Sequence, residues 1–226
     1  QQDAALQHGP PVPRLDTHGQ PVTRWDGTTR PHPVTGLPVP DETARIAVLD
    51  YPNPRPAEWP KADFIIGNPP FIGDKAMRAA LGDGYVEALR KAYKGSVPES
   101  ADFVMYWWYN SALIAQRGGV ERFGFITTNS LKQTFNRRVI QPFIDGDNPS
   151  LALSFAIPDH PWVDGGDGAA VRIAMTVAER APAIGYLLNV RTETVAEGDD
   201  ASDVTFSEAQ GRIFANLTVG VDMDSA

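Results

Sequence analysis

The chain has 226 residues, of which 42% are hydrophobic and 21% are charged, an ordinary globular composition that can build one substantial core. The absence of cysteine excludes disulfide frameworks, thiolate metal sites and cysteine nucleophiles, and the four histidines show no metal-ligand spacing. The formal net charge of −8 argues against strong nucleic-acid binding by this chain alone, although residues 61–150 carry 11 basic and 9 acidic side chains. Since no run of 18 apolar residues occurs, no membrane span is expected.

The first 60 residues form a proline-rich segment. They contain 12 of the 20 prolines, which exclude long helices and central strands. We therefore expect an irregular excursion with short hairpin strands over residues 8–42. A short buried strand over residues 45–49, ending at Asp50, should follow it.

From residue 61 onward, strands and helices alternate. The expected elements are strand 63–67, helix 83–94, helix 101–117 with Ser100 as its N-cap, strand 123–128 and helix 131–145. Pro142 should bend or shorten the last helix.

Two apolar runs, residues 151–157 and 169–178, then flank a loop rich in Pro, Asp and Gly. They predict an antiparallel strand pair, followed by an acidic, weakly β-like extension over residues 181–226. The pattern indicates an α/β Rossmann-like sheet, mostly parallel, that ends in antiparallel strands. Ligands of such sheets bind beyond the carboxyl ends of the strands, where residues 68–71, 127–130 and the start of the loop 158–168 should meet.

The motif that carries chemistry is Asn68-Pro69-Pro70-Phe71, directly after the apolar strand. It resembles the catalytic motif of amino methyltransferases, and this resemblance implies roles for its four residues. The side-chain oxygen of Asn68 and the carbonyl of Pro69 can accept the two N–H bonds of an exocyclic amine, while the fixed φ of Pro70 holds the turn. A neutral amide also suits a site that faces a sulfonium cation. Phe71 offers a ring on which a base can stack, worth about 1–3 kcal/mol. The alternative is a strand-terminating turn with a core Phe.

This motif resembles the catalytic motif of S-adenosylmethionine-dependent amino methyltransferases, above all the adenine-N6 DNA enzymes. Cytosine-C5 enzymes need a cysteine nucleophile, which this chain lacks. The flanking sequence is similar to the MmeI-like single-chain restriction–modification enzymes (type IIL, related to type IIG). The stretches that carry this similarity are residues 67–75, 101–108, 127–130, 136–138 and 167–172.

The resemblance implies a larger polypeptide that acts on double-stranded DNA. Residues 1–60 would be the edge of the methyltransferase domain, residues 61–180 its catalytic half, and residues 181–226 a link toward a target-recognition region. This sequence departs from the family in having no Gly-rich strand–turn–helix before residue 61 and no recognisable nuclease motif. We therefore expect the N-terminal part of the domain, with the cofactor-cradling loop, to lie upstream.

Other residues receive roles by this resemblance. Trp162 would contact a flipped target base together with Phe71, or it would simply cover the base of its loop. Asp50 would bind the cofactor adenine, as a second cofactor contact beside Asn68. The basic side chains Lys75, Lys132, Arg137 and Arg138 would contact DNA phosphates, or they would form solvated helix faces.

The sequence leaves other substrates and one other class of function open. RNA, cytosine N4 and protein glutamine are alternative methyl acceptors for an Asn-Pro-Pro-aromatic site. A non-catalytic DNA-specificity or scaffold module of the same fold is the alternative from another class. The adenine-N6 prediction, in a bacterial restriction–modification or phage-defence protein of the cytoplasm, is the one that the flanking similarity favours.

Overall fold

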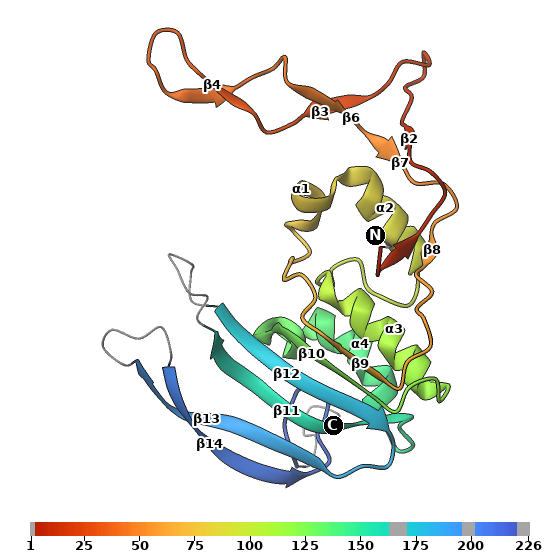
Figure 1. Ribbon diagram of the computed structural model, residues 1–226, viewed down its shortest axis with the longest axis vertical. Coiled ribbons are helices and arrows are strands. Elements are labelled where there is room, and N and C mark those ends of the chain that lie inside the picture. The colour runs from red at the N-terminus through yellow and green to blue at the C-terminus, as the bar shows by residue number, and fades with distance from the viewer. Residues whose placement is uncertain (1–2, 163–170, 196–201, 221–226) are drawn as a thin grey trace. The chain divides into compact units, whose positions relative to one another are not determined.

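The computed structural model describes residues 3–162, 171–195 and 202–220 (Figure 1). The chain divides into two compact units, one of Gln1–Glu58 with Ala76–Tyr93 and one of Trp59–Lys75 with Lys94–Ala226. The predicted boundaries near residues 60 and 180 rested on composition. Composition alone does not show that the helical segment Ala76–Tyr93 belongs to the same unit as Gln1–Glu58.

In the first unit, the proline-rich segment forms four short antiparallel strand pairs. These are β1 (Leu6–Gln7) with β8 (Arg55–Pro56), β2 (Val12–Pro13) with β7 (Leu49–Asp50), β3 (Thr23–Trp25) with β6 (Arg45–Ala47), and β4 (Thr29–Pro31) with β5 (Pro38–Pro40). The strand expected over residues 45–49 is thus divided between β6 and β7. It is also not buried, because Ile46 is 42% and Leu49 is 36% exposed. Three of these pairs contain proline, which supplies no backbone donor and thus keeps their ladders short.

Two helices complete the first unit: α1 (Met77–Leu81) and α2 (Asp83–Ala92), the latter close to the expected helix 83–94. The α2 helix buries Val86 and Leu89, and its tyrosines fix the N-terminal residues. The hydroxyl of Tyr85 donates to Asp3 Oδ2 at 2.7 Å, and the hydroxyl of Tyr93 donates to the carbonyl of Ala5 at 2.7 Å. The Pro-rich segment is therefore anchored by hydrogen bonds.

The second unit is built on a six-stranded sheet with the order β14-β13-β11-β12-β10-β9. Its strands are β9 (Phe64–Gly67), β10 (Arg122–Thr128), β11 (Leu151–Trp162), β12 (Val171–Arg180), β13 (Gly185–Val195) and β14 (Ser202–Gly211). The pairs β9–β10 and β11–β13 are parallel and the other three pairs are antiparallel. The expected α/β class is confirmed, whereas a mostly parallel sheet is not, since the described strands form a mixed sheet.

Helices cover one face of this sheet (Figure 1). They are α3 (Val104–Gln116), the 3₁₀ turn η1 (Asn129–Lys132) and α4 (Thr134–Ile144). Trp108 of α3 is fully buried between the rings of Phe123 at 5.3 Å and Phe143 at 6.0 Å. This aromatic cluster forms the centre of the core beneath β10. The helix α4 continues past Pro142 to Ile144, and it starts later than expected because residues 131 and 132 belong to η1.

Two local expectations are corrected. The N-cap of α3 is Phe103, without a side-chain cap, in place of Ser100. Strand β11 continues through Pro158 to Trp162, which pairs with Val171, because β-bulges absorb the irregular residues that the sequence indicated as a loop. Residues 163–168 of that predicted loop lie outside the described residues.

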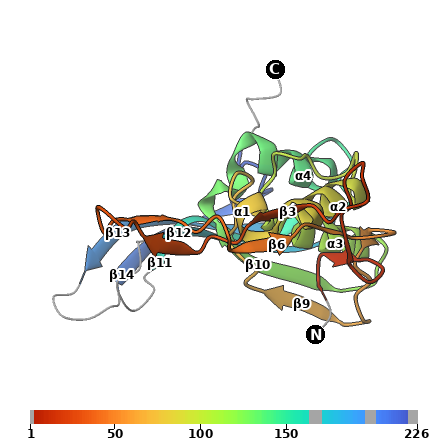
Figure 2. The same ribbon diagram turned by 90° about the horizontal axis from the view of Figure 1, so that it is seen from above.

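Residues 181–226, which we expected to lead away from the domain, supply β13 and β14 to the same sheet. At the opposite edge, β9 lies beside β10 (Figure 2). Within the described residues, no helix has both the length and the apolar character needed to cross a membrane.

Candidate active site

Three strands end at the same edge of the sheet. Strand β9 runs parallel to β10, with Gly67 opposite Phe125. Strands β10 and β11 are both antiparallel to β12, and Thr128 and His160 lie opposite the same residue, Ile173. The carboxyl ends of β9, β10 and β11 therefore point the same way. The prediction that residues 68–71, 127–130 and the segment from 158 share one edge is confirmed.

The motif residues leave β9 in a tight turn. The N–H of Ile72 donates to the carbonyl of Pro70 at 3.0 Å. Asn68 is exposed, Pro69 is buried and Phe71 is half-buried. The amide of Asn68 is thus accessible, and the nearby ring of Phe71 is partly packed against the protein. An amide can hydrogen-bond the polar edge of a planar group, and an aromatic ring can stack on its face.

Close packing precedes the motif at Gly67. A Cβ atom at this position would lie 3.2 Å from the ring of Phe125 on the neighbouring strand. The glycine lets β9 approach the buried aromatic residues of β10 just before the chain turns away. The exit of the motif from the sheet is therefore fixed by the core beneath it.

The start of α3 holds the loop that follows the motif. The N–H of Phe103 donates to the carbonyl of Ile72 at 2.9 Å, and the N–H of Asp74 donates to Asp102 Oδ1 at 3.2 Å. The other carboxylate oxygen of Asp102 accepts from Ser130 Oγ at 2.6 Å and from Asn136 Nδ2 at 2.7 Å. From the sequence, no role was assigned to Asp102, and Asn136 was considered only as a candidate phosphate contact beside the basic residues of its helix. An acidic residue just before an apolar helix could have indicated a role for Asp102. Its hydrogen-bond partners come from other elements, which the sequence does not show.

A second polar network joins the ends of β10, β11, β12 and β13. Asp159 Oδ1 accepts from Asn129 Nδ2 at 3.0 Å and from Arg172 Nε at 2.7 Å. Arg172 also donates to both carboxylate oxygens of Glu193, at 2.7 and 3.1 Å. Burial opposes ionisation of Asp159, but the hydrogen bonds from Arg172 and Asn129 and the charge of Arg172 outweigh it and hold the pKa of Asp159 below its usual range. The same guanidinium, hydrogen-bonded to Glu193, lowers the pKa of Glu193.

Trp162 occupies a different place from the expected one. It is half-buried at the end of β11, and the ring of His160, two residues earlier, stacks on Phe206 at 5.9 Å. The register sets Trp162 three strand spacings and four residues away from Asn68, roughly 20 Å on a flat sheet. Strand register alone therefore does not bring Phe71 and Trp162 to the two faces of one base.

The predicted phosphate contacts lie in the second unit, three of them on η1 and α4 and Lys75 outside these elements. Lys132 ends η1 and is half-buried, and Arg137 on α4 is also half-buried. Arg138 is exposed, with its guanidinium 5.5 Å from the centre of the Phe135 ring. Lys75 is exposed after the motif loop. Lys132, Arg137 and Arg138 follow the carboxyl end of β10 in the chain, and their contact with DNA stays a prediction.

Asp50 lies in the first unit and has another partner. Its Oδ1 accepts from Arg14 Nε at 2.8 Å, and Arg14 also contacts Glu87 at 2.6 Å. Hydrogen bonds from Arg14 to Asp50 and Glu87 raise the pKa of the Arg14 guanidinium. Asp50 ends β7, which pairs with β2 and is not a strand of the six-stranded sheet. The predicted contact of Asp50 with a cofactor therefore has no support from this geometry.

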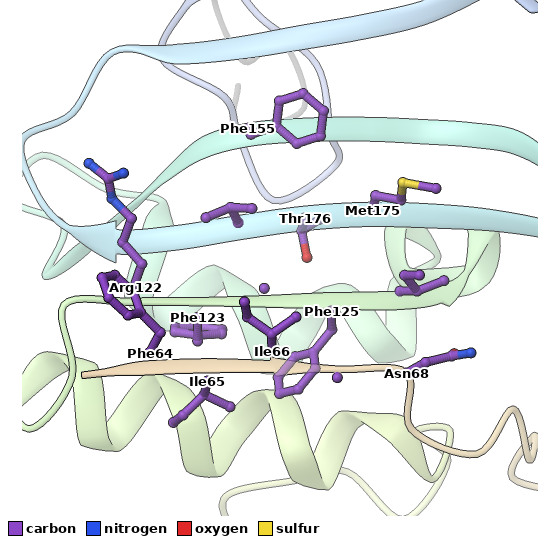
Figure 3. A pocket seen from close by; sticks show the side chains of 14 residues that line it. Phe64, Ile65, Ile66, Asn68, Arg122, Phe123, Phe125, Phe155, Met175 and Thr176 are labelled. Atoms are coloured by element: carbon purple, nitrogen blue, oxygen red, sulfur yellow. The ribbon is translucent and has the colours of Figure 1, made fainter. Parts of the chain in front are cut away.

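The face of the sheet opposite α3 and α4 carries an apolar groove of about 620 Å³ (Figure 3). On β9, Phe64 is 54% and Ile66 is 87% exposed along this groove. Strands β10, β11 and β12 extend it with Ile126, Phe155, Met175 and Val177. Asn68 stands at its end, just past β9 (Figure 3). Apolar residues on both sides of a parallel strand are typical of a strand covered on both faces.

The mixed α/β sheet that carries the Asn68–Phe71 turn at its carboxyl edge is similar to methyltransferase folds. The sequence profile of the family described as "MmeI, DNA-methyltransferase domain" matches residues 38–183. Because the match covers more than half of the chain, the chain belongs to this family. No curated protein sequence matches it.

The fold is similar to that of one solved restriction–modification enzyme, and two further structures are more distantly similar. The type IIL restriction–modification enzyme MmeI, determined in complex with DNA, is 21% identical with a TM-score of 0.52, over 71% of this chain and 20% of MmeI. A modification subunit of a putative type I restriction enzyme from Vibrio vulnificus YJ016 is 15% identical over 65% of this chain and 27% of that one, with a TM-score of 0.40. A type I methyltransferase subunit from Streptococcus thermophilus is 12% identical over 66% and 31%, with a TM-score of 0.38. The chain thus spans about a fifth of the length of MmeI.

Proposed function

We propose that this chain is the catalytic part of a DNA methyltransferase that transfers a methyl group from S-adenosylmethionine to the N6 amine of a flipped adenine. The full protein would be a restriction–modification or phage-defence enzyme of the bacterial cytoplasm. The observation that carries the proposal is the exposed amide of Asn68 at the carboxyl end of β9, in a turn that ends in a half-buried Phe71. Membership of the MmeI methyltransferase family supports the choice of DNA.

The acceptor side of the reaction follows from these residues. The lone pair of the adenine amine is delocalised into the ring, so the amine is a poor nucleophile. Asn68 Oδ1 and the carbonyl of Pro69 would accept its two N–H bonds and thereby favour a localised lone pair directed at the methyl carbon. The nitrogen–carbon bond then forms as the carbon–sulfur bond breaks, and the amine loses one proton to water. Stacking on Phe71 would compensate part of the few kcal/mol that base extrusion costs.

The residues of this chain fit the part of a cofactor site that faces the methyl group and the sulfur. When bound, S-adenosylmethionine supplies an electrophilic methyl group on a positively charged sulfur, and the uncharged Asn68 amide suits that neighbour. Asp50, the other predicted contact, is committed to Arg14. The sequence contains no Gly-rich strand–turn–helix to hold the rest of the cofactor before the motif. The chain itself therefore provides the amine-binding side of the site.

We further propose that β9 is an inner strand of a mostly parallel Rossmann-like sheet in the complete enzyme. The exposed apolar side chains of Phe64 and Ile66 and the groove beside them support this proposal. A strand paired alongside β9, with its helix laid over the groove, would bury this face. Such a strand–helix unit is also where a Gly-rich cofactor loop belongs in this fold class.

The test uses the complete natural polypeptide. The wild type, Asn68→Ala and the control Asn148→Ala, which removes an exposed amide from the turn before β11, are expressed in a methylation-deficient bacterium. Modified nucleosides in the digested DNA are quantified by mass spectrometry. We expect N6-methyladenine with the wild type and the control and none with Asn68→Ala. N4-methylcytosine, or methylation found only in RNA or on glutamine, would refute the adenine assignment. A wild type that modifies nothing and does not bind S-adenosylmethionine would support a scaffold role.

A further inference from the structure

The carboxylate of Asp102 connects two loops that leave neighbouring strands. Its Oδ1 accepts the N–H of Asp74, which belongs to the loop after β9. Its Oδ2 accepts from Ser130 Oγ, which belongs to the turn after β10. Each oxygen of the Asp102 carboxylate therefore accepts a hydrogen bond from a different loop at the candidate active-site edge.

Asn136 fixes the orientation of this carboxylate. Asn136 is only 4% exposed, and its Nδ2 donates to Asp102 Oδ2 at 2.7 Å and to the carbonyl of Ser130 at 3.0 Å. In return, its Oδ1 accepts the backbone N–H of Asp102 at 2.9 Å. The pair is thus reciprocal, and the buried amide of Asn136 has one orientation that satisfies all of these contacts.

The next residue adds a backbone contact to the same loop. The N–H of Phe103 donates to the carbonyl of Ile72, directly after the motif. The segment from Pro70 to Asp74 is therefore held at Ile72 and at Asp74 by the start of α3, and it is closed internally by the Ile72–Pro70 bond. These bonds leave little freedom to the turn that carries Asn68 and Phe71.

We propose that Asp102 is a positioning residue for methyl transfer, which acts by holding the Asn68–Phe71 turn against the end of β10 with the help of Asn136. This inference rests on the proposed function. It predicts an effect on the rate of the bound complex, because a displacement of about 1 Å of a reacting group can cost about 100-fold in rate. Affinity for DNA and for cofactor should change little.

The substitution Asp102→Asn tests this role with minimal change in shape. An amide has one acceptor oxygen and one donor nitrogen, so its nitrogen must face either the Asp74 N–H or the Ser130 and Asn136 donors. The substitution Asn136→Asp places a second carboxylate 2.7 Å from the first and removes the donor. The exchanged pair Asp102→Asn with Asn136→Asp restores a donor opposite an acceptor between residues 102 and 136, and Ser130 Oγ can then donate to residue 136. The carbonyl of Ser130, which accepts from Asn136 Nδ2 at 3.0 Å in the wild type, loses its donor, so the exchange restores the network in part.

The experiment measures kcat, KM for S-adenosylmethionine and KM for DNA with the complete natural polypeptide. We expect a 10- to 100-fold lower kcat for each single variant, both KM values within threefold, and a partial recovery of kcat in the exchanged pair. The control Asp63→Asn removes an exposed carboxylate at the opposite end of β9 and should leave kcat unchanged. A wild-type kcat in Asp102→Asn, or a raised KM with unchanged kcat, would overturn the proposal.

Hydrogen exchange of the backbone amides separates this proposal from the proposed function. In Asp102→Asn, exchange should rise at residues 72–74 and 103, while the amides of β10 and β12 stay as protected as in the wild type. If the wild type transfers no methyl group to DNA, the proposed function fails but this measurement still decides whether Asp102 holds the turn. Unchanged exchange at residues 72–74, or a general loss of protection across the sheet, would refute the positioning role.

Discussion

The two faces of the six-stranded sheet should respond very differently to loss of a large side chain. Phe123 on β10 is 2% exposed and packs between Trp108 at 5.3 Å and Phe125 at 6.0 Å. Substituting a buried Phe with Ala costs about 3–5 kcal/mol, because the removed ring leaves a cavity that the rigid surroundings fill only in part. We expect a loss of this size in the free energy of unfolding for Phe123→Ala.

Ile66 on β9 provides the matched comparison. It is 87% exposed, so only a small part of its side chain is removed from water. Scaling the roughly 2–5 kcal/mol for a fully buried Ile→Ala by the buried fraction, and allowing for the lower strand propensity of Ala, gives at most about 1 kcal/mol. The ratio of the two losses therefore measures how completely the groove side of the sheet is uncovered.

The assay is urea unfolding of the 226-residue chain followed by tryptophan fluorescence. All variants carry Trp25→Phe, because Trp25 is in the first unit and the other four tryptophans are in the second. Nearly equal losses for Phe123→Ala and Ile66→Ala would refute the interpretation of an open face. In the complete natural polypeptide, the loss for Ile66→Ala should rise toward about 2–5 kcal/mol if another segment covers the groove.

Three other predictions concern single residues. Gly84→Ala should destabilise the first unit by about 1–3 kcal/mol in thermal unfolding, because the new Cβ atom would lie 1.7 Å from the carbonyl oxygen of Leu49. The control Gly9→Ala should be nearly neutral, because the nearest atom to its new Cβ would be 3.5 Å away. The pKa of Asp159 is lowered from its ordinary value of 3.8, so the ionised carboxylate stabilises the folded chain above about pH 3.8, and this stabilisation disappears as the pH falls through the lowered pKa. The difference in unfolding free energy between the wild type and Asp159→Asn should therefore shrink below this pH. A difference that persists there would contradict the ion pair with Arg172. Arg138→Ala should weaken DNA binding by the complete natural polypeptide equally on all sequences and reduce the salt slope by about 1, and an unchanged slope would exclude a phosphate contact.

The sequence alone determined the local features near the motif. The apolar run before Asn68 ends abruptly in two prolines, which predicts a strand and a turn without tertiary information, and β9 and the Pro70–Ile72 turn agree with this. The apolar helix over residues 101–117, with a stop at Gly118-Gly119, and the strand over residues 123–128 were also predicted from the sequence, and α3 and β10 agree with them. The shared carboxyl edge also followed from sequence, because parallel strands bring their ends together.

Only the tertiary structure decided which partners these elements have. A charged residue pairs with whatever the fold brings near, so the sequence could not predict that Asp50 contacts Arg14 or that Asp102 contacts residues 28 and 34 positions later. Strand order is equally non-local, since β13 and β14 extend a sheet whose opposite edge is β9. The exposure of Ile66 could not be predicted from the sequence either. Its apolar side chain indicates a strand that is covered on both faces, but burial depends on which segments pack against the strand. Local propensity thus fixed the motif and its turn, whereas long-range contacts fixed the environment in which they act.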